Sequence, residues 1–291
     1  GLMCPFCHSS GNRTLFPAKD LFFGTPGDYK IVRCLECRLR YTTPLPEDLE
    51  SVYPEEYGPH ADTNIRPLNR LLKKIFEMRS TLLPDLPRGA RVLEIGCGAG
   101  GFLSSIKNRG WKRHGLEPVP AAAALARKSG AEIFEGTLQK NDWPDGHFDA
   151  IFAWMAIEHL PRLREDLLEI GRLLTPGGWL GFSVPNADSW EFSFFRDKWY
   201  DLQVPIHVSH FGKRELDHAL GTAGLKRIRL DHQRNILSII GSVGLLWGKR
   251  SIIAYPDRPS RIGQALLYPI ACVLAAFRQG GRVTGLARKE N

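Results

Sequence analysis

The stretch "VLEIGCGAGGFL" (residues 92–103) decides the fold class of this chain. An apolar run typical of a buried strand is followed directly by glycines at 96, 98, 100 and 101. Glycine permits a tight strand-to-helix turn and lets the backbone approach a ligand closely. Such a turn predicts a doubly wound α/β sheet with a ligand in the crevice at the end of this strand.

An acidic residue further along the chain narrows the choice of ligand. Gly96, Gly98 and Gly101 satisfy the spacing G-x-G-x-x-G, and Glu117 lies about twenty residues further on, at the end of the next expected strand. A carboxylate at that place accepts hydrogen bonds from a ribose diol. On these residues alone, a nicotinamide dinucleotide and S-adenosylmethionine fit equally well.

The rest of the chain alternates between strand and helix patterns. We expect strands over residues 91–96, 114–118, 131–136, 148–154 and 179–184, and helices over residues 101–110, 121–130, 163–174 and 213–224. This alternation predicts a mostly parallel sheet with helices on both faces and the ligand at the carboxyl ends of its strands.

Five motifs in chain order resemble the class I S-adenosylmethionine-dependent methyltransferases. They are "VLEIGCGAGGFL", "GLEP", "FDAIFAWMAIEHL", "LLTPGGWLGFSVPN" and "IHVSHFGKRELDHALGTAGL". The resemblance covers residues 88–230 and a last strand, "RVTGLARKE" (residues 282–290). It implies a Rossmann-like fold with a seven-stranded sheet and S-adenosylmethionine as cofactor. Nothing downstream resembles a hydride-transfer site, which speaks against a dehydrogenase.

The resemblance also assigns cofactor-binding roles. Glu94 would hold the methionine end, Glu117 would bind both ribose hydroxyls, and Trp154 would end the strand beside the sulfonium. The family has an aspartate for the adenine amino group where this chain has Thr137, so either Thr137 or Asp142 would take that role. The expected cofactor-binding residues are therefore Glu94, Gly96, Gly98, Gly100, Glu117, Thr137 and Trp154.

Three histidines are candidate catalytic residues. A hydroxyl, acidic carbon or protonated amine acceptor needs a general base, ideally with a pKa near 7. His159 follows the fourth strand, and His207 and His210 precede a helix. Alternatively, these side chains brace their loops. Related quinone methyltransferases that bind a divalent metal have a glutamate where this chain has Met155, so we expect no catalytic metal.

Four of the six cysteines form two C-x-x-C pairs, Cys4 with Cys7 and Cys34 with Cys37, separated by 26 residues. Two such turns supply the four thiolates of a closed tetrahedral zinc site. With four protein ligands, this zinc would fold the N-terminal segment and would not catalyse. The segment resembles the zinc ribbon fused to one branch of the methyltransferase family.

These patterns divide the chain into five parts. We expect a zinc ribbon over residues 1–45, a linker over 46–65, and the cofactor-binding core over 66–235, which begins with a helix over 69–83. Within the core, residues 187–210 form an aromatic lid over the acceptor or, alternatively, a small satellite core. An insertion over residues 236–280 then precedes the last strand and C-terminus, residues 281–291.

Charge is concentrated in the C-terminal part of the chain. Residues 226–291 contain 12 Lys or Arg against 3 Asp or Glu, whereas residues 1–225 contain 27 against 28. The insertion also has two apolar stretches, "ILSIIGSVGLLWG" and "ALLYPIACVLAAF". Apolar segments with basic flanks predict peripheral contact with an anionic membrane. Packing on the domain or a dimer contact explains them equally well.

The sequence thus predicts a methyltransferase that acts on a small-molecule, sugar or lipid-linked acceptor. An RNA methyltransferase that uses its zinc ribbon and basic tail is the alternative, although nucleic acid is the less favoured partner because the basic residues lie outside the ribbon. The chain shows no secretory signal or membrane-spanning stretch, which favours a cytoplasmic protein, in contact with the membrane if the insertion binds lipid.

Overall fold

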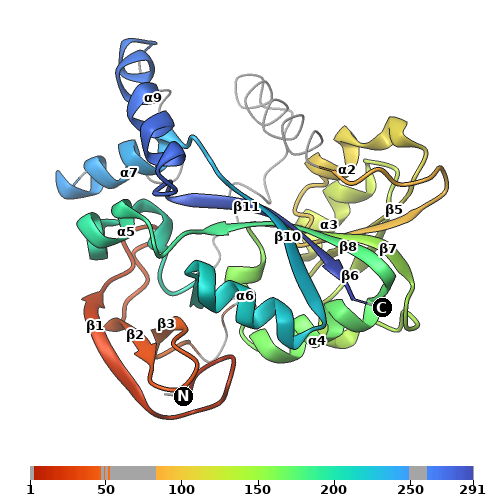
Figure 1. The fold of residues 1–291 in the computed structure, drawn as a ribbon, viewed down its shortest axis with the longest axis horizontal. Helices are drawn as coiled ribbons and strands as arrows, with labels where there is room; N and C mark the ends of the chain where they lie inside the picture. The colour runs from red at the N-terminus through yellow and green to blue at the C-terminus, as the bar shows by residue number, and fades with distance from the viewer. Residues whose placement is uncertain (1–2, 47–48, 50–51, 53–82, 249–260, 291) are drawn as a thin grey trace.

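The computed structural model describes residues 3–46, 49, 52, 83–248 and 261–290, and of residues 261–266 only the backbone. Two sheets organise the described chain, a seven-stranded sheet flanked by helices and a four-stranded sheet near the N-terminus (Figure 1). The expected linker over residues 46–65 and the expected helix over residues 69–83 lie almost entirely outside the described residues.

The seven-stranded sheet has the strand order β10-β11-β8-β7-β4-β5-β6. Its strands are β4 (Arg91–Ile95), β5 (Lys112–Glu117), β6 (Glu132–Glu135), β7 (Phe148–Trp154), β8 (Leu174–Pro185), β10 (Leu225–His232) and β11 (Arg282–Lys289). Neighbours from β6 to β8 pair in parallel, and β11 runs antiparallel to both β8 and β10. The predicted Rossmann-like, mostly parallel sheet is confirmed. Its strand order reverses at β4, which places the binding crevice at the carboxyl ends of β4 and β7.

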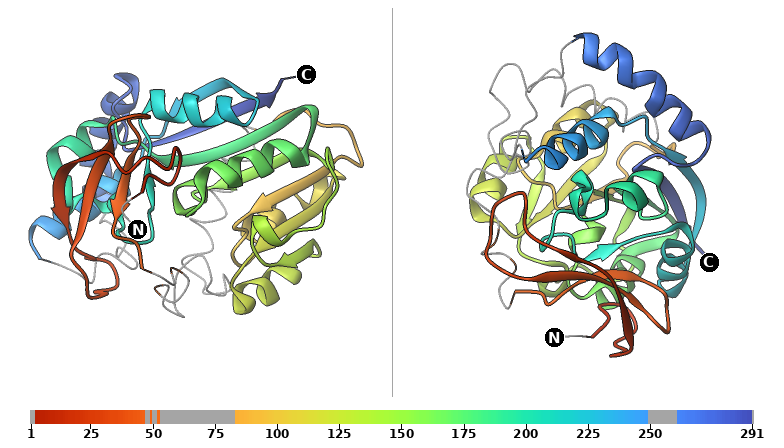
Figure 2. Two further views of the ribbon diagram at one scale, coloured as in Figure 1. Left: turned by 90° about the horizontal axis from the view of Figure 1, so that it is seen from below. Right: turned by 90° about the vertical axis from the view of Figure 1, so that its left-hand side faces the viewer.

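Helices cover both faces of this sheet (Figures 1 and 2). On one face, α2 (Gly101–Ser105) and α3 (Pro120–Arg127) contact β5. On the other, α4 (Leu163–Leu173) packs against α6 (Lys213–Thr222) and β8. The helix expected over residues 101–110 is shorter than predicted. It ends at Ser105 and gives way to a 3₁₀ turn, η3 (Lys107–Arg109).

Strand β7 shows why the central strands read as unbroken apolar runs. Ala150, Phe152 and Trp154 point into the core on the α2 side, whereas Ile151 and Ala153 point into the core on the α4 side. Side chains alternate between the faces of a strand, so a strand covered on both faces needs apolar residues at every position.

The N-terminal sheet is antiparallel, and one of its strands comes from a part of the chain that is distant in sequence. Its order is β1 (Asn12–Ala18), β2 (Tyr29–Cys34), β3 (Arg40–Thr43) and β9 (Ser209–His210). Strand β9 directly precedes α6, and its residues pair with Arg40 and Tyr41 of β3. The N-terminal segment is therefore joined by backbone hydrogen bonds to the part of the chain that leads into α6.

The aromatic segment lies against this N-terminal sheet. It contains α5 (Trp190–Phe195) and the 3₁₀ turns η6 (Arg196–Lys198) and η7 (Tyr200–Leu202). Four of its aromatic side chains are buried, namely Phe192, Phe195, Trp199 and Tyr200. Phe192 and Trp199 share a core with Phe16 and Ile31 of β1 and β2. Those side chains form the satellite core that the sequence offered as one alternative. Coverage of an acceptor stays a prediction for the rest of the segment.

The insertion between β10 and β11 contains two helices. They are α7 (Ile236–Leu246) and α9 (Arg261–Ala276), which pack against each other and project from one end of the molecule (Figures 1 and 2). Within the described residues, neither they nor any other helix is long and apolar enough to cross a membrane.

Candidate active site

The glycine turn lies between β4 and α2. Gly96, Gly98 and Gly100 have φ angles of 64°, 50° and 77°, the left-handed region that favours glycine. The amide of Gly96 donates a hydrogen bond to the carbonyl of Leu116 on β5 over 2.8 Å. A Cβ on Gly100 would lie 2.9 Å from Cα of Ala126. Glycine at this position therefore lets α3 pack directly against the turn.

Two buried carboxylates lie beside the turn. Glu117, at the end of β5, accepts hydrogen bonds from the amides of Gly98 over 2.8 Å and Val119 over 3.0 Å. Glu94 is buried on β4. Burial, reinforced by both carboxylates, raises the pKa of the Cys97 thiol. The structure thus brings together both acids that the sequence assigned to the cofactor.

The other two cofactor-binding candidates lie in different surroundings. Thr137 follows β6 at the start of the 3₁₀ turn η4 (Leu138–Lys140) and is half-buried at the sheet edge. Trp154 ends β7, and its indole packs in the core, stacked on Phe152 at 5.7 Å and edge-on to Phe102 at 5.4 Å. Thr137 therefore lies at the strand ends, whereas the side chain of Trp154 lies among core residues beneath the turn.

The strand ends fit an adenosyl cofactor. A Cβ on Gly96 would meet Cβ of Ala156, from the loop after β7, at 3.4 Å. Gly96 thus lets the turn after β4 lie close to the loop after β7, where the two strand ends meet. Two amides hold the Glu117 carboxylate at the end of β5, and a carboxylate accepts hydroxyl donors such as those of a ribose.

Two of the three candidate histidines lie together. The rings of His159 and His207 meet edge-to-face with centroids 4.6 Å apart. Nδ1 of His207 lies 2.8 Å from the carbonyl of Asp201, and because a carbonyl only accepts, Nδ1 carries the proton. Burial, followed by neighbouring His159 and His210, lowers the pKa of His207 well below its ordinary value. His207 is therefore neutral, with Nε2 as the proton acceptor.

His210, the third candidate, makes its side-chain hydrogen bond to the N-terminal sheet. It belongs to β9, is buried, and its Nε2 lies 3.0 Å from the hydroxyl of Thr42 on β3. Burial, followed by nearby Arg40, lowers the pKa of His210 to about 3. This side chain joins β9 to the N-terminal sheet. The same Thr42 hydroxyl donates a hydrogen bond to the carbonyl of His207 over 2.7 Å, so Thr42 links His210 to the histidine pair.

Sequence reasoning did not single out three charged residues around the histidine pair, of which Glu158 and Asp201 are buried and Arg282 is half-buried. Glu158 has its carboxylate within 4.8 Å of nitrogen atoms of both His159 and His207, a group of side chains able to hold a cation. Asp201, whose carbonyl orients His207, forms an ion pair with Arg282 of β11, Oδ1 and Oδ2 each 3.0 Å from Nε. Glu158 was visible beside His159. Asp201 and Arg282 are 81 residues apart in the chain, so no sequence motif links them.

The four predicted zinc-binding cysteines converge. Their sulfur atoms all lie within 4.8 Å of one another, with Cys4 3.5 Å from Cys37 and Cys7 3.4 Å from Cys34. These separations are too long for disulfides, whose S–S bond is about 2.05 Å. They approach the edge of a zinc tetrahedron with bonds of about 2.3 Å, roughly 3.8 Å. Four thiols so placed fit a tetrahedral zinc ion.

The residue after each C-x-x-C pair has a left-handed backbone, with φ of 59° at His8 and 68° at Arg38. The two turns thus share one conformation, as expected when both present thiols to one centre. His8 itself is engaged elsewhere, because its Nε2 lies 3.1 Å from a carboxylate oxygen of Glu165 on α4. That contact ties the cysteine turns to the seven-stranded domain.

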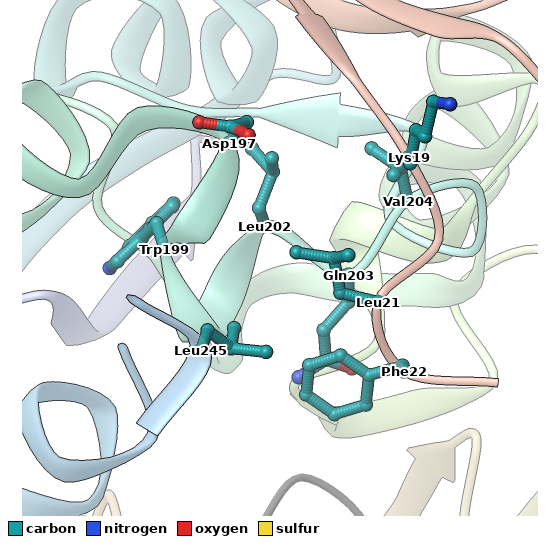
Figure 3. Close-up of a pocket in the computed structure, with 9 residues that line it drawn as sticks. All are labelled: Lys19, Leu21, Phe22, Asp197, Trp199, Leu202, Gln203, Val204 and Leu245. Atoms are coloured by element: carbon teal, nitrogen blue, oxygen red, sulfur yellow. The ribbon is translucent and has the colours of Figure 1, made fainter. Parts of the chain in front are cut away.

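A small cavity marks where the N-terminal segment, the aromatic segment and α7 meet (Figure 3). Its walls include Leu21 and Phe22 from the loop after β1, Trp199 and Leu202 from the aromatic segment, and Leu245 from α7. Its volume of about 10 Å³ has room for one water molecule. The three parts therefore pack closely here and leave no room for a substrate.

The fold and the glycine turn define the class of protein. A seven-stranded sheet with one antiparallel strand, β11, and a bare turn beside Glu94 and Glu117 are the features expected of a class I methyltransferase. The family model described as "Methyltransferase domain" matches residues 67–230. The chain therefore belongs to the methyltransferase domain family, within the class that depends on S-adenosylmethionine.

The chain is also similar in sequence to individual methyltransferases. A malonyl-[acyl-carrier protein] O-methyltransferase from Enterobacter lignolyticus is 31% identical over 48% of this chain and 57% of that protein. A 24-methylenesterol C-methyltransferase from rice, Oryza sativa, is 30% identical over 65% of this chain and 50% of that protein. The chain thus spans about half the length of these relatives.

A solved structure of geranyl diphosphate C-methyltransferase from Streptomyces coelicolor is similar with a TM-score of 0.56. That similarity has 16% sequence identity and covers 81% of this chain and 85% of that one. At this identity, the likeness concerns the fold.

Proposed function

We propose that this protein transfers the methyl group of S-adenosylmethionine to a small-molecule, sugar or lipid-linked acceptor. The observation that carries the proposal is the left-handed turn at Gly96, Gly98 and Gly100 with the amide-held carboxylate of Glu117 beside it. Relatives named for malonyl-[acyl-carrier protein] and sterol substrates support an acceptor of this kind.

The cofactor supplies an electrophilic methyl group, so the protein's task is alignment and proton removal. The turn would lie against the methionine and ribose portions, with Glu94 on the methionine side. Glu117 would bind the ribose hydroxyls, and Thr137 would lie toward the adenine. These roles need no movement of the sheet, because every residue named already lies at the strand ends.

Calorimetric titration of the purified protein with S-adenosylhomocysteine tests the proposed cofactor-binding roles. We expect binding at a one-to-one ratio, lost in Glu117→Ala, whereas Glu135→Ala on the exposed side of β6 should bind like the parent. Labelled methyl transfer from the cofactor into cell extracts would then identify the acceptor. Lack of binding by intact, folded protein would contradict the proposal.

We infer further that His207, assisted by His159, removes the acceptor proton. The hydrogen bond from Nδ1 of His207 to Asp201 fixes the ring and leaves Nε2 as the base. Because burial lowers the pKa of His207, methyl transfer should persist below pH 6.5 and fall only when His207 becomes protonated. General bases contribute about 10²- to 10⁴-fold to rates, so His207→Gln should lower kcat by that factor.

His147→Gln, at the opposite end of β7, is the matched control and should retain full activity. A rate that falls near pH 6.5 instead would assign the base to a histidine with an ordinary pKa. Activity that requires added divalent metal would assign Glu158, His159 and His207 to a cation and contradict the base role.

A structural zinc ion bound by Cys4, Cys7, Cys34 and Cys37 completes the proposal. The N-terminal module then serves the methyltransferase domain rather than RNA, since two of its arginines face that domain. Arg40 lies 2.9 Å from Asp188, and Arg33 lies 3.8 Å from Glu215. RNA retained through purification in high salt would favour the alternative RNA substrate.

A further inference from the structure

Strand β3 of the N-terminal sheet contacts the candidate base through Thr42. The hydroxyl of Thr42 donates a hydrogen bond to the carbonyl of His207 over 2.7 Å, and its amide donates to the carbonyl of Val208 over 2.9 Å. Each of these three residues is at most 1% exposed. Thr42 therefore holds the backbone at His207 with both its side chain and its own backbone, away from solvent.

The direction of these hydrogen bonds fixes the Thr42 hydroxyl. Nε2 of His210 lies 3.0 Å from the same oxygen. A hydroxyl has one proton to donate and a carbonyl only accepts, so the proton points to His207 and the oxygen accepts the Nε2 proton of His210. Rotation of the hydroxyl would leave a buried polar group without a partner, which is costly. The contact to His207 is therefore rigid.

The same peptide group is held from the opposite side by the methyltransferase domain. The amide of Val208 donates over 2.8 Å to the carbonyl of Glu158, in the 3₁₀ turn η5 (Ile157–His159) that follows β7. The C=O and N–H of a trans peptide group point in opposite directions. The peptide group between His207 and Val208 therefore lies between β3 and the turn that contains His159.

A third segment fixes the imidazole of His207. Nδ1 donates to the carbonyl of Asp201, and the amide of His207 donates to the carbonyl of Gln203 over 2.9 Å. Because the ring and the backbone are held by different segments, a shift of the backbone would move Nε2 relative to a bound acceptor. A displacement of about 1 Å at a reacting group can lower a rate about a hundredfold.

We propose that Thr42 is a positioning residue for methyl transfer, because its hydroxyl holds the backbone of His207 so that Nε2 lies where the acceptor proton leaves. This inference rests on the proposed role of His207 as the base. The acceptor's proton moves to Nε2, its freed electron pair bonds to the methyl carbon, and the electrons of the broken carbon–sulfur bond stay on sulfur. Thr42 neither gives nor takes a proton. The N-terminal module thus completes the active site of the methyltransferase domain.

The test begins with Thr42→Val, which removes the hydroxyl and keeps the backbone hydrogen bond to Val208. The rate is measured as transfer of labelled methyl groups from S-adenosylmethionine into a cell extract that supplies the acceptor. We expect kcat to fall about ten- to a hundredfold, with the KM for S-adenosylmethionine unchanged. Thr42→Ser, which restores a hydroxyl, should recover most of the lost rate.

Thr43→Val is the matched control on the same strand. Thr43 is 2% exposed, and its hydroxyl has no hydrogen-bond partner within the described chain. This variant should keep the parental rate. Titration with S-adenosylhomocysteine checks that each variant is folded. If Thr42→Val does not fold, Thr42→Ala takes its place, because the smaller side chain leaves room for a water molecule at the His207 carbonyl.

A double-mutant cycle separates positioning from a general structural effect. In the His207→Gln background, Thr42→Val should lower the rate no further, because a residue that acts through His207 has no base left to position. A parental rate in folded Thr42→Val, or equal losses in both backgrounds, would overturn the positioning role and leave the base role intact. A parental rate in His207→Gln alone would contradict the base role, and this inference with it.

Discussion

At the scale of single residues, the structure distinguishes two reasons why a position requires glycine: a left-handed backbone, and a lack of space for a side chain. Gly89 and Gly100 have nearly the same left-handed φ, 83° and 77°. An added Cβ on Gly89 would meet nothing within 4 Å, whereas on Gly100 it would lie 2.9 Å from Cα and 3.1 Å from the carbonyl oxygen of Ala126. Gly89→Ala therefore introduces backbone strain alone, and Gly100→Ala adds a clash with α3.

We expect Gly89→Ala to lower the free energy of unfolding by about 1–2 kcal/mol, the cost of a left-handed non-glycine residue. Gly100→Ala should lower it by a further ~1–3 kcal/mol, because backbone atoms of α3 must shift. Gly100→Ala should also weaken cofactor binding, since the shift moves the turn. Urea denaturation measures both losses. Equal losses of stability in the two variants would contradict this expectation, because they would mean that α3 accommodates the added Cβ without a loss of free energy.

At the scale of elements, a buried carboxyl group holds α5 in place. Glu191 on α5 accepts hydrogen bonds from the hydroxyl of Ser238 on α7 and from the amide of Gly281, 3.0 Å away before β11. Burial nevertheless raises the pKa of Glu191 from 4.5 to about 7. The contacts through which Glu191 joins α5 to α7 and to the start of β11 should therefore depend on pH.

The sign of this dependence follows from proton binding. Between pH 4.5 and about 7, the folded protein keeps the Glu191 proton while the unfolded chain loses it, so this group's contribution to stability falls as pH rises. Glu191→Gln should remove that decline, about 3 kcal/mol in full, and be more stable than the parent above pH 7. Urea midpoints of both proteins at pH 5 and pH 8 measure it. A parallel decline in the variant would assign the effect to another group.

At the scale of the whole molecule, the N-terminal module and the methyltransferase domain share contacts that zinc would support. Strand β3 pairs with β9, and Phe16 and Ile31 share a core with Trp199. Since β9 and the aromatic segment also lead to the histidine pair, loss of the cysteine centre should disturb the active site at a distance.

We expect one zinc ion per chain by elemental analysis. Its removal with a chelator, or Cys34→Ser, should lower the thermal midpoint and expose the Trp199 core to solvent. Tryptophan fluorescence follows this exposure. Ser substitution of Cys272, which lies on α9 outside the cluster, should keep both the zinc and the midpoint. Zinc-free protein with parental stability would contradict a structural metal.

Much of the fold followed from local patterns. The strand expected over residues 148–154 matches β7, and the last strand expected over residues 282–290 matches β11 to within one residue. The spacing of apolar residues along a strand or helix depends only on the geometry of that element, so these elements can be predicted without knowledge of long-range contacts. The helix over 101–110 was overestimated because Gly110, with φ of 74°, and the preceding residues favour a 3₁₀ turn.

The sequence by itself determined the parallel sheet, the glycine turn and the cysteine spacing, because apolar periodicity, left-handed backbone and thiol geometry act over a few neighbouring residues. Only the tertiary structure decided that His207 joins His159 while His210 joins Thr42. It also decided that Asp201 meets Arg282. Such contacts join positions far apart in the chain, and their selection depends on how strands and helices pack rather than on any spacing along the sequence.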